Sequence, residues 1–317
     1  MAPKVPRVSF SNGLSVPIIG LGTWLAAPGE VTTAVKEAIS CGYRHIDCAR
    51  LYGNEPEVGA GIKAKLQDGT IKREDLFVTT KLWLTDAKKE YVVPALKGQL
   101  KSLGLTYVDL YLVHWPVNLR HGDEYFPKKA DGSTDFGTDY DLVGVWRGME
   151  EAVNEGLAKS IGLSNYNKRQ VETILKNAKV KPVTNQVECH PYLSQKKLIN
   201  FCKSNGLTIT AYSPLGSPSR PEQESTDPVL LQDPVVLELA KKYNKNAGQI
   251  LIRYQIENCN IVIPKSVKPS RIKSNFDVFD FKFSSEDLKK LEDLNQNYRL
   301  IYFNIKDHPE YPFNEEY

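Results

Sequence analysis

The stretch from Leu76 to Trp115, "LFVTTKLWLTDAKKEYVVPALKGQLKSLGLTYVDLYLVHW", contains the pattern that decides the fold. It begins with a short β-branched run that ends in polar residues, "LFVTTK", and it finishes with a second run, "VDLYLVHW". Between the two runs, Val92–Leu103 has the apolar spacing of an amphipathic helix. A strand, a helix and a second strand in this order indicate two parallel strands joined by a right-handed crossover.

The same unit recurs along the chain. The runs are "PIIGLGT", "YRHID", "LFVTTK", "VDLYLVHW", "AKSIGLSN", "VTNQVE", "LTITAYS" and "CNIVIPKS". Helical patterns separate them, among them Val31–Ser40, Glu57–Leu66, Val92–Leu103, Leu142–Asn154, Arg169–Asn177, Gln195–Ser204 and Ala247–Glu257. Eight strands buried on both faces predict an α/β protein of the closed (β/α)₈ barrel type, with residues 1–317 as one domain.

An open doubly wound sheet is the alternative, and it requires a G-x-G-x-x-G fingerprint between its first strand and helix. The segment Gly20–Gly22 has Leu25 at the position of the third glycine. Gly59–Gly61 with Ala64 fits the spacing but lies inside a helical pattern rather than after a strand. The barrel is therefore the favoured interpretation.

Four segments lie outside the repeat. Alternating residues around Asn12-Gly13 predict an N-terminal hairpin with a two-residue turn. The connections 117–141 and 214–234 are long enough to be lids or binding loops. The tail from Asn295 onward is rich in aromatic residues and is expected to pack on the barrel as a long C-terminal loop.

The composition is that of an ordinary soluble protein, with 41% hydrophobic and 25% charged residues. A net charge of +3 without a Lys/Arg block argues against nucleic acid as a partner. No apolar run of membrane-spanning length and no signal-peptide pattern is present, which argues against a membrane partner. Five cysteines in a chain of 317 residues are interpreted as reduced thiols of a cytoplasmic protein.

In a barrel, the carboxyl ends of all strands meet on one face, where active sites form. The residues at these ends are Asp47 with Tyr52 just beyond it, Lys81, His114, Ser164, Asn165, Gln186, Tyr212, Ser213, Lys265 and Ser266. We expect them to be neighbours in space.

The first four of these residues suit proton transfer. A tyrosine phenol has a reference pKa of about 10, and a nearby ammonium group lowers that pKa. Asp47 would pair with Lys81 and hold its charge, and His114 would donate a hydrogen bond to a substrate oxygen. Tyr52 would then act as a general acid toward an oxygen that becomes negatively charged.

Each residue also has an ordinary structural interpretation: an ion pair, a packed histidine or a surface tyrosine. All four groups at the ends of three consecutive strands favour the catalytic one. No metal site is predicted, because the five histidines and the cysteines lack ligand spacing. A serine hydrolase would need a G-x-S-x-G elbow, which the sequence lacks.

The chain resembles the aldo-keto reductase family, in particular its aldose reductase-like branch. The motifs that carry the resemblance, in order, are "GYRHIDCARLYGNE", "FVTTKLW", "VDLYLVHWP", "SIGLSNYN", "NQVECHPY", "AYSPLGSP" and "IPKSVKPSRIKSN". The resemblance implies a monomeric barrel that uses NADPH to reduce aldehydes and ketones, with a small-molecule carbonyl as substrate. It places the catalytic residues at Asp47, Tyr52, Lys81 and His114, with Tyr52 as the proton donor.

The resemblance also implies where NADPH would bind. Ser164, Asn165 and Gln186 would hold the carboxamide, Tyr212 would stack on the nicotinamide, and Ser213, Leu215 and Ser217 would follow the pyrophosphate. Lys265, Ser266, Arg271 and Asn275 would hold the 2′-phosphate and adenine, with Thr23, Trp24, Asp47 and Val267 as further contacts. Lys268, Ser274 and Ser219 depart from the family pattern, which affects the expected adenine contacts and the loop over the cofactor.

The substrate pocket is expected to be apolar, lined by Trp24, Trp83, Trp115, Phe126 and Tyr302 around Tyr52 and His114. Such a pocket suits hydrophobic aldehydes and aromatic or steroid-like ketones, and Leu300–Asn304 would set the preference among them. Two other functions remain open. Lys81 could form a Schiff base as in aldolases, and a barrel of this family could serve as a cofactor sensor or a lens-type structural protein.

Overall fold

The computed structural model describes residues 5–221 and 223–315. Its main sheet contains eight parallel strands that pair in chain order. The strands are β3 (Leu21–Gly22), β4 (His45–Asp47), β5 (Phe77–Leu82), β6 (Leu110–Val113), β7 (Ile161–Ser164), β8 (Thr184–Glu188), β9 (Thr208–Tyr212) and β10 (Ile261–Val262).

The sheet closes on itself where β10 meets the segment that leads into β3. Val262 N donates to Ile18 O at 2.8 Å, and Gly20 N donates to Val262 O at 2.9 Å. A parallel bridge between Gly22 and Lys265 extends this seam toward the carboxyl ends of the strands. The predicted (β/α)₈ barrel is confirmed.

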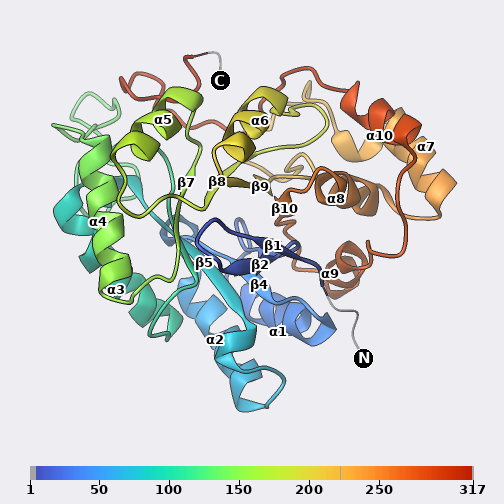
Figure 1. The fold of residues 1–317 in the computed structure, drawn as a ribbon, viewed down its shortest axis with the longest axis horizontal. Coiled ribbons are helices and arrows are strands. Elements are labelled where there is room, and N and C mark those ends of the chain that lie inside the picture. The colour runs from blue at the N-terminus through green and yellow to red at the C-terminus, as the bar shows by residue number, and fades with distance from the viewer. Residues whose placement is uncertain (1–4, 222, 316–317) are drawn as a thin grey trace.

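Helices that follow the strands surround the barrel (Figure 1). They are α1 (Val31–Cys41), α2 (Glu55–Gln67), α3 (Lys89–Leu103), α4 (Leu142–Asn154), α5 (Lys168–Asn177), α6 (Lys196–Ser204), α8 (Ala247–Glu257) and α9 (Pro269–Phe276). Asparagine caps begin two of them: the Asn167 and Asn246 side chains accept from the backbone N–H groups of Gln170 and Gln249, and each glutamine side chain bonds back.

Two further helices were not among those predicted, namely α7 (Pro234–Tyr243) and α10 (Ser285–Glu292). Both have local start signals: Asp233 caps α7 ahead of Pro234, and Ser284 caps α10. Four 3₁₀ turns complete the regular structure: η1 (Arg50–Tyr52), η2 (Arg73–Asp75), η3 (Leu84–Asp86) and η4 (Leu230–Gln232).

The N-terminal hairpin consists of β1 (Arg7–Ser9) and β2 (Ser15–Pro17). The predicted two-residue turn is wrong. Phe10 N donates to Leu14 O at 2.8 Å and Gly13 N donates to Phe10 O at 3.1 Å, so residues 11–13 form a three-residue connection. Gly13 has a φ of 85°, which lets the chain reverse there without steric cost.

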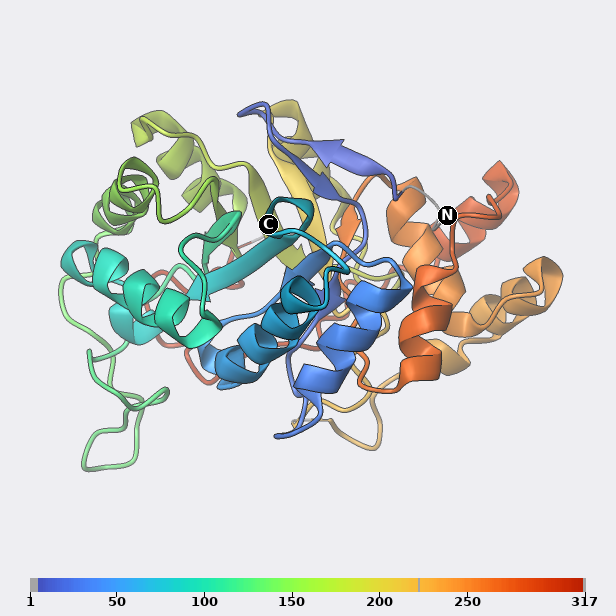
Figure 2. The same cartoon turned by 90° about the horizontal axis from the view of Figure 1, so that it is seen from below.

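The hairpin covers the amino-terminal end of the barrel. Phe10 and Val16 are buried against side chains at the start of the strands, including Phe77, Leu110 and Ile261. Figure 2 shows the hairpin at one end of the barrel and the segments 117–141, 214–221 and 223–229 at the other. The carboxyl ends of the strands therefore stay open to a set of long loops.

The barrel interior is tightly packed at one glycine. A Cβ at Gly162 would lie 2.8 Å from a Leu112 methyl group and 2.9 Å from Thr184 O, so the close approach of β7 to its neighbours requires glycine.

Within the described part of the chain, no helix is long and apolar enough to span a membrane.

The long connection 117–141 is irregular, as its lack of a periodic pattern indicates. All of 117–141 is described, and no residue in it belongs to an α-helix or a strand. The aromatic tail packs on the barrel as expected: Ile305 and Tyr311 are buried in one cluster with Trp83, Trp115 and Leu119.

Candidate active site

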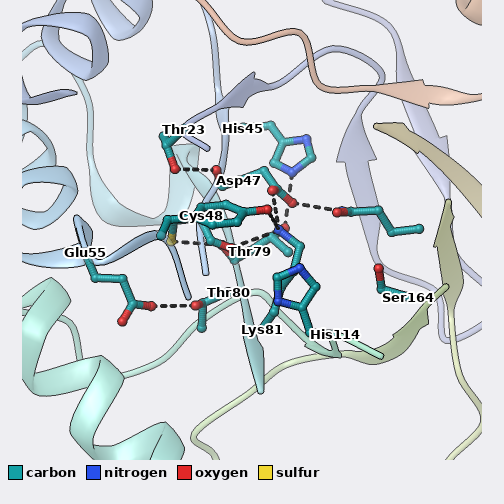
Figure 3. Close-up of polar contacts among 12 residues, drawn as sticks. Thr23, His45, Asp47, Cys48, Glu55, Thr79, Thr80, Lys81, His114 and Ser164 are labelled. Carbon is teal, nitrogen blue, oxygen red and sulfur yellow. Dashed lines mark hydrogen bonds and ion pairs between the residues drawn. The ribbon is translucent and has the colours of Figure 1, made fainter. Parts of the chain in front are cut away.

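An ion pair at the carboxyl ends of two neighbouring strands forms the centre of the site. Lys81 on β5 is fully buried, and its ammonium group donates to Asp47 Oδ1, to Cys48 O at 3.0 Å and to the Tyr52 hydroxyl at 3.2 Å. Figure 3 shows the Lys81 amine pointing at the Asp47 carboxylate. Gln186 on β8 donates to the other carboxylate oxygen at 2.9 Å.

This set of bonds keeps Lys81 charged. Burial lowers its pKa, but the charge of Asp47 and the hydrogen bonds to Asp47 and Tyr52 outweigh burial, and the net pKa is raised. Because each member of the pair satisfies the other, removing one would leave an uncompensated buried charge, which typically costs about 3–5 kcal/mol.

Tyr52 is held by a short turn directly after β4. It is the last residue of η1, and Gly53 ends the turn with a φ of 66°. Burial raises the pKa of the phenol to about 12, although the Lys81 charge acts in the opposite direction. The expectation that Lys81 lowers the pKa of Tyr52 is therefore wrong for the protein without bound ligands. The increase in pKa caused by desolvation is larger than the decrease caused by the Lys81 charge. The phenol is protonated at neutral pH, as a proton donor must be.

His114 follows β6 and faces the phenol. Its ring lies 5.9 Å from the Tyr52 ring and 5.3 Å from the Trp83 ring, both edge to face. Burial, together with the nearby Lys81 charge, holds the pKa of the imidazole well below its usual value. A neutral imidazole carries one N–H, so it can donate a single hydrogen bond toward the cavity.

A second layer of polar residues lies beside this group at the carboxyl ends of β7, β8 and β9. Asn165 has a φ of 62°, and its backbone N–H donates to Gln186 O at 2.9 Å. Its side chain donates to His114 O at 3.0 Å and accepts from the Tyr212 hydroxyl at 2.7 Å. Thr23 donates to Asp47 O at 2.9 Å on the opposite side.

A cavity of about 650 Å³ runs from Tyr52 and His114 to the start of α9. The predicted site residues on its wall are Thr23, Trp24, Asp47, Tyr52, His114, Trp115, Asn165, Gln186, Tyr212, Ser213, Leu215, Ser217, Lys265, Ser266, Val267, Arg271 and Asn275. The structure thus brings together on one wall residues from the ends of seven strands, all except β5, and from the following loops.

The far end of the cavity fits a phosphate-bearing cofactor. Lys265 and Arg271 line it beside the N-terminus of α9, whose free N–H groups favour anions. Lys265 is half-buried and donates only to Leu25 O, at 2.8 Å, among the bonds of the described residues. Burial lowers its pKa, so a bound anion would stabilise the charged form.

The comparisons with known proteins agree with this geometry. The model of the family described as "Aldo/keto reductase family" matches residues 18–296. The chain belongs to the aldo/keto reductase family. Curated relatives include aldo-keto reductase family 1 member A1 of Xenopus tropicalis, 49% identical over 100% of both chains, and that of Homo sapiens, 49% identical over 98% of both.

Two solved structures of the family superpose closely. The aldose reductase of Schistosoma japonicum has a TM-score of 0.92 at 44% identity and covers 99% of this chain and 100% of its own. A Bombyx mori aldo-keto reductase in complex with NADP has a TM-score of 0.88 at 41% identity, covering 98% of this chain and 100% of its own.

Several predicted residues do not lie on the cavity wall. Lys81 is buried behind it, and so is Ser164 at the end of β7. Trp83 is also fully buried, whereas the side chains of Phe126 and Tyr302 are 45% and 49% exposed. Trp83 and Phe126 still contact each other, with ring centroids 5.4 Å apart.

Other residues that line the cavity were not predicted from the sequence, namely Gly22, Leu25, Leu51, Pro214, Pro218, Leu231, Asn246, Ala247, Gly248 and Ile263. Ile301 and Phe303 also line it; they lie in the segment Leu300–Asn304, which was expected to set the preference, but were not named individually. In the tail, Ile301 and Phe303 face the cavity while Tyr302 between them faces solvent. Which of these side chains faces the cavity depends on how the tail lies on the barrel, and no local pattern of the sequence indicates it.

The three departures from the aldo/keto reductase pattern, Ser219, Lys268 and Ser274, also line the cavity. The loop that carries Ser219 is held by its neighbour: buried Arg220 pairs with Asp227 and donates to Ser217 O. The Tyr298 hydroxyl also donates to Asp227, at 2.6 Å, which ties this loop to the tail.

Proposed function

We propose that this aldo/keto reductase is an NADPH-dependent oxidoreductase that reduces aldehydes and ketones to alcohols, with Tyr52 as the proton donor. The observation that carries the proposal is the 3.2 Å contact between the Tyr52 hydroxyl and the charged Lys81 amine at the wall of the cavity. The NADP complex of the Bombyx mori neighbour supports the choice of cofactor.

Held by residues of the cavity wall such as Tyr212 and Arg271, NADPH would supply the hydride for the carbonyl carbon. Tyr52 transfers its proton to the oxygen as negative charge develops there. Lys81, kept charged by Asp47, stabilises the phenolate that remains. The neutral imidazole of His114 donates a hydrogen bond that orients the carbonyl oxygen.

We propose neutral, apolar carbonyl compounds as the substrate class. Trp24, Leu51, Trp115, Ile301 and Phe303 are apolar side chains on the cavity wall. The cationic side chains on that wall, as far as the described residues go, are Lys265, Lys268 and Arg271, all between β10 and the first turns of α9. An apolar wall near the phenol favours hydrophobic aldehydes and aryl or flat polycyclic ketones.

Schiff-base chemistry at Lys81 is disfavoured, since an amine must be unprotonated to attack a carbonyl. Lys81 lies off the cavity wall and donates to Asp47, Cys48 and Tyr52, and its pKa is raised rather than lowered. We extend the proposal to a single-domain, monomeric enzyme of the cytoplasm; the free state of all five cysteines supports a reducing compartment.

The direct test is the loss of NADPH absorbance with a panel of carbonyl compounds that differ in size and charge. We expect turnover with neutral aromatic aldehydes. The same assay distinguishes an enzyme from a cofactor sensor. Tight NADPH binding without oxidation by any aldehyde or ketone would contradict the proposal and favour the sensor. Borohydride trapping of a keto substrate on Lys81 would instead favour the aldolase.

A further inference from the structure

We infer that Glu188 is a positioning residue that sets substrate specificity by fixing the tail wall of the cavity. Glu188 is the last residue of β8 and its side chain is fully buried. It lies off the cavity wall, so it would act through the tail rather than on the substrate. The inference rests on the proposed function, because it takes the apolar end of the cavity as the substrate site.

The Glu188 carboxylate holds two consecutive amides of the tail. Leu300 N donates to Oε1 at 2.8 Å, and Ile301 N donates to Oε2 at 3.0 Å. His190 Nε2 lies 2.8 Å from Oε1 and is itself fully buried. A buried carboxylate is stable only when hydrogen-bond donors surround it. Two of the donors to Glu188 are tail amides, so the carboxylate fixes the position of the tail rather than only filling space in the core.

The anchored amides precede the residues that form the wall. Ile301 lines the cavity directly after the anchor, and Phe303 follows two residues later. The Phe303 ring lies 5.3 Å from Trp115 and 5.7 Å from Phe126. A second anchor closes the segment, since the Thr134 hydroxyl donates to Asn304 O at 2.9 Å.

The wall is therefore a short span held at both ends, by a buried charged acceptor at 300–301 and by an exposed hydroxyl at 304. Charged acceptors make the stronger hydrogen bonds, so Glu188 is the firmer anchor. Loosening it lets Ile301 and Phe303 move. A large substrate that packs against both side chains then loses its contacts, whereas a small one that reaches only Tyr52 and His114 does not.

Glu188→Gln tests this inference because it keeps the shape of the side chain and removes the charge and one acceptor oxygen. We expect the KM of a bulky aryl ketone to rise about tenfold or more, the size of a lost pocket contact. We expect the KM of propanal and both kcat values to change less than about threefold. Binding of NADPH, followed by fluorescence, should not change.

Glu150→Gln is the matched control. Glu150 is also a buried carboxylate that accepts from two consecutive amides, Lys179 N at 2.6 Å and Val180 N at 2.9 Å, but it lies on α4 away from the cavity. Equal losses for both substrates in Glu188→Gln, or the same pattern in Glu150→Gln, would reduce Glu188 to a structural role. Unchanged kinetics in Glu188→Gln would also overturn the inference.

A measurement on the unmodified protein keeps the inference testable if Glu188→Gln does not fold. Residue-resolved hydrogen–deuterium exchange should find the amides of Leu300 and Ile301 slower than that of Tyr302. Equal rates at the three positions would contradict the anchor. If none of the carbonyl compounds tested causes the unmodified protein to oxidise NADPH, the proposed function fails. The exchange result does not depend on that outcome, because it measures only whether Glu188 holds the tail amides.

Discussion

The Lys81 amine lies 3.2 Å from the Tyr52 hydroxyl and is shared with the Asp47 carboxylate. This contact places a permanent positive charge beside a phenol whose pKa burial raises to about 12. The phenol therefore keeps its proton until a stronger base, such as a developing alkoxide, forms beside it. The ammonium then stabilises the phenolate that the transfer leaves.

Arg271→Ala should weaken NADPH binding by about 1.5–3 kcal/mol and barely change NADH binding, because charged hydrogen bonds are worth about this much. Arg271 lines the phosphate end of the cavity beside the N-terminus of α9, and the two cofactors differ only by the 2′-phosphate. Fluorescence titration with both cofactors measures the effect. Lys273→Ala, on the same helix but off the cavity wall, is the control. Equal losses for NADPH and NADH would remove Arg271 from phosphate recognition.

Replacing the inward-facing tail residues should reorder substrate preference without changing NADPH affinity. Ile301→Ala and Phe303→Ala are each expected to lower kcat/KM for bulky aryl ketones by about tenfold or more. Tyr302→Ala is the matched neighbour, and its half-exposed side chain predicts a smaller effect. A larger effect at Tyr302 than at Phe303 would mean that the outward-facing residue binds substrate, as the sequence alone suggests.

A negative charge on the substrate should be penalised. We expect kcat/KM for para-carboxybenzaldehyde to be about tenfold or more below that for para-nitrobenzaldehyde, because an apolar wall offers a desolvated carboxylate no partner. The two compounds are close in size, so the comparison isolates charge. Equal values would indicate that a cation reaches the substrate end of the cavity.

The free energy of unfolding should fall as the pH is lowered from about 6.5 to about 4. Burial lowers the pKa of His45 from 6.5 to about 4, so in this range the unfolded chain binds a proton that the folded chain excludes. His45 alone contributes at most about 3 kcal/mol, and His114, whose pKa is also lowered, acts in the same direction.

Urea unfolding at several pH values checks this prediction. His45→Gln should flatten the dependence, whereas His121→Gln, at a side chain that is 49% exposed, is the matched control. Equal slopes in the unmodified protein and His45→Gln would show that His45 does not carry the effect.

The barrel could be predicted because its signals are local and repeated. Each strand is a short apolar run, each crossover is a periodic helix, and chain order fixes which strand ends meet. The helices α7 and α10 were not predicted, although Asp233 and Ser284 precede them as caps, because both are additional to the single helix that the repeat places after each strand. The hairpin was predicted, but its loop length depends on how Phe10 pairs with Leu14.

The site residues could be predicted where their position follows from the order of the strands along the chain. Asp47, Lys81 and His114 lie where strand ends place them, whereas the net pKa of Tyr52 depends on desolvation, which no spacing reveals. The facing of Tyr302 and the anchor at Glu188 depend on how a distant tail lies on the barrel. Contacts of this range have no local sequence signal.

Single-turnover reduction by Tyr52→Phe measures whether Tyr52 delivers the proton. We expect the rate of reduction to fall by about 10²–10⁴-fold, which is the usual contribution of a general acid. The affinity for NADPH should stay within about twofold, because the hydroxyl acts on the transition state. A variant that retained more than about a tenth of the rate with normal NADPH affinity would contradict Tyr52 as the proton donor.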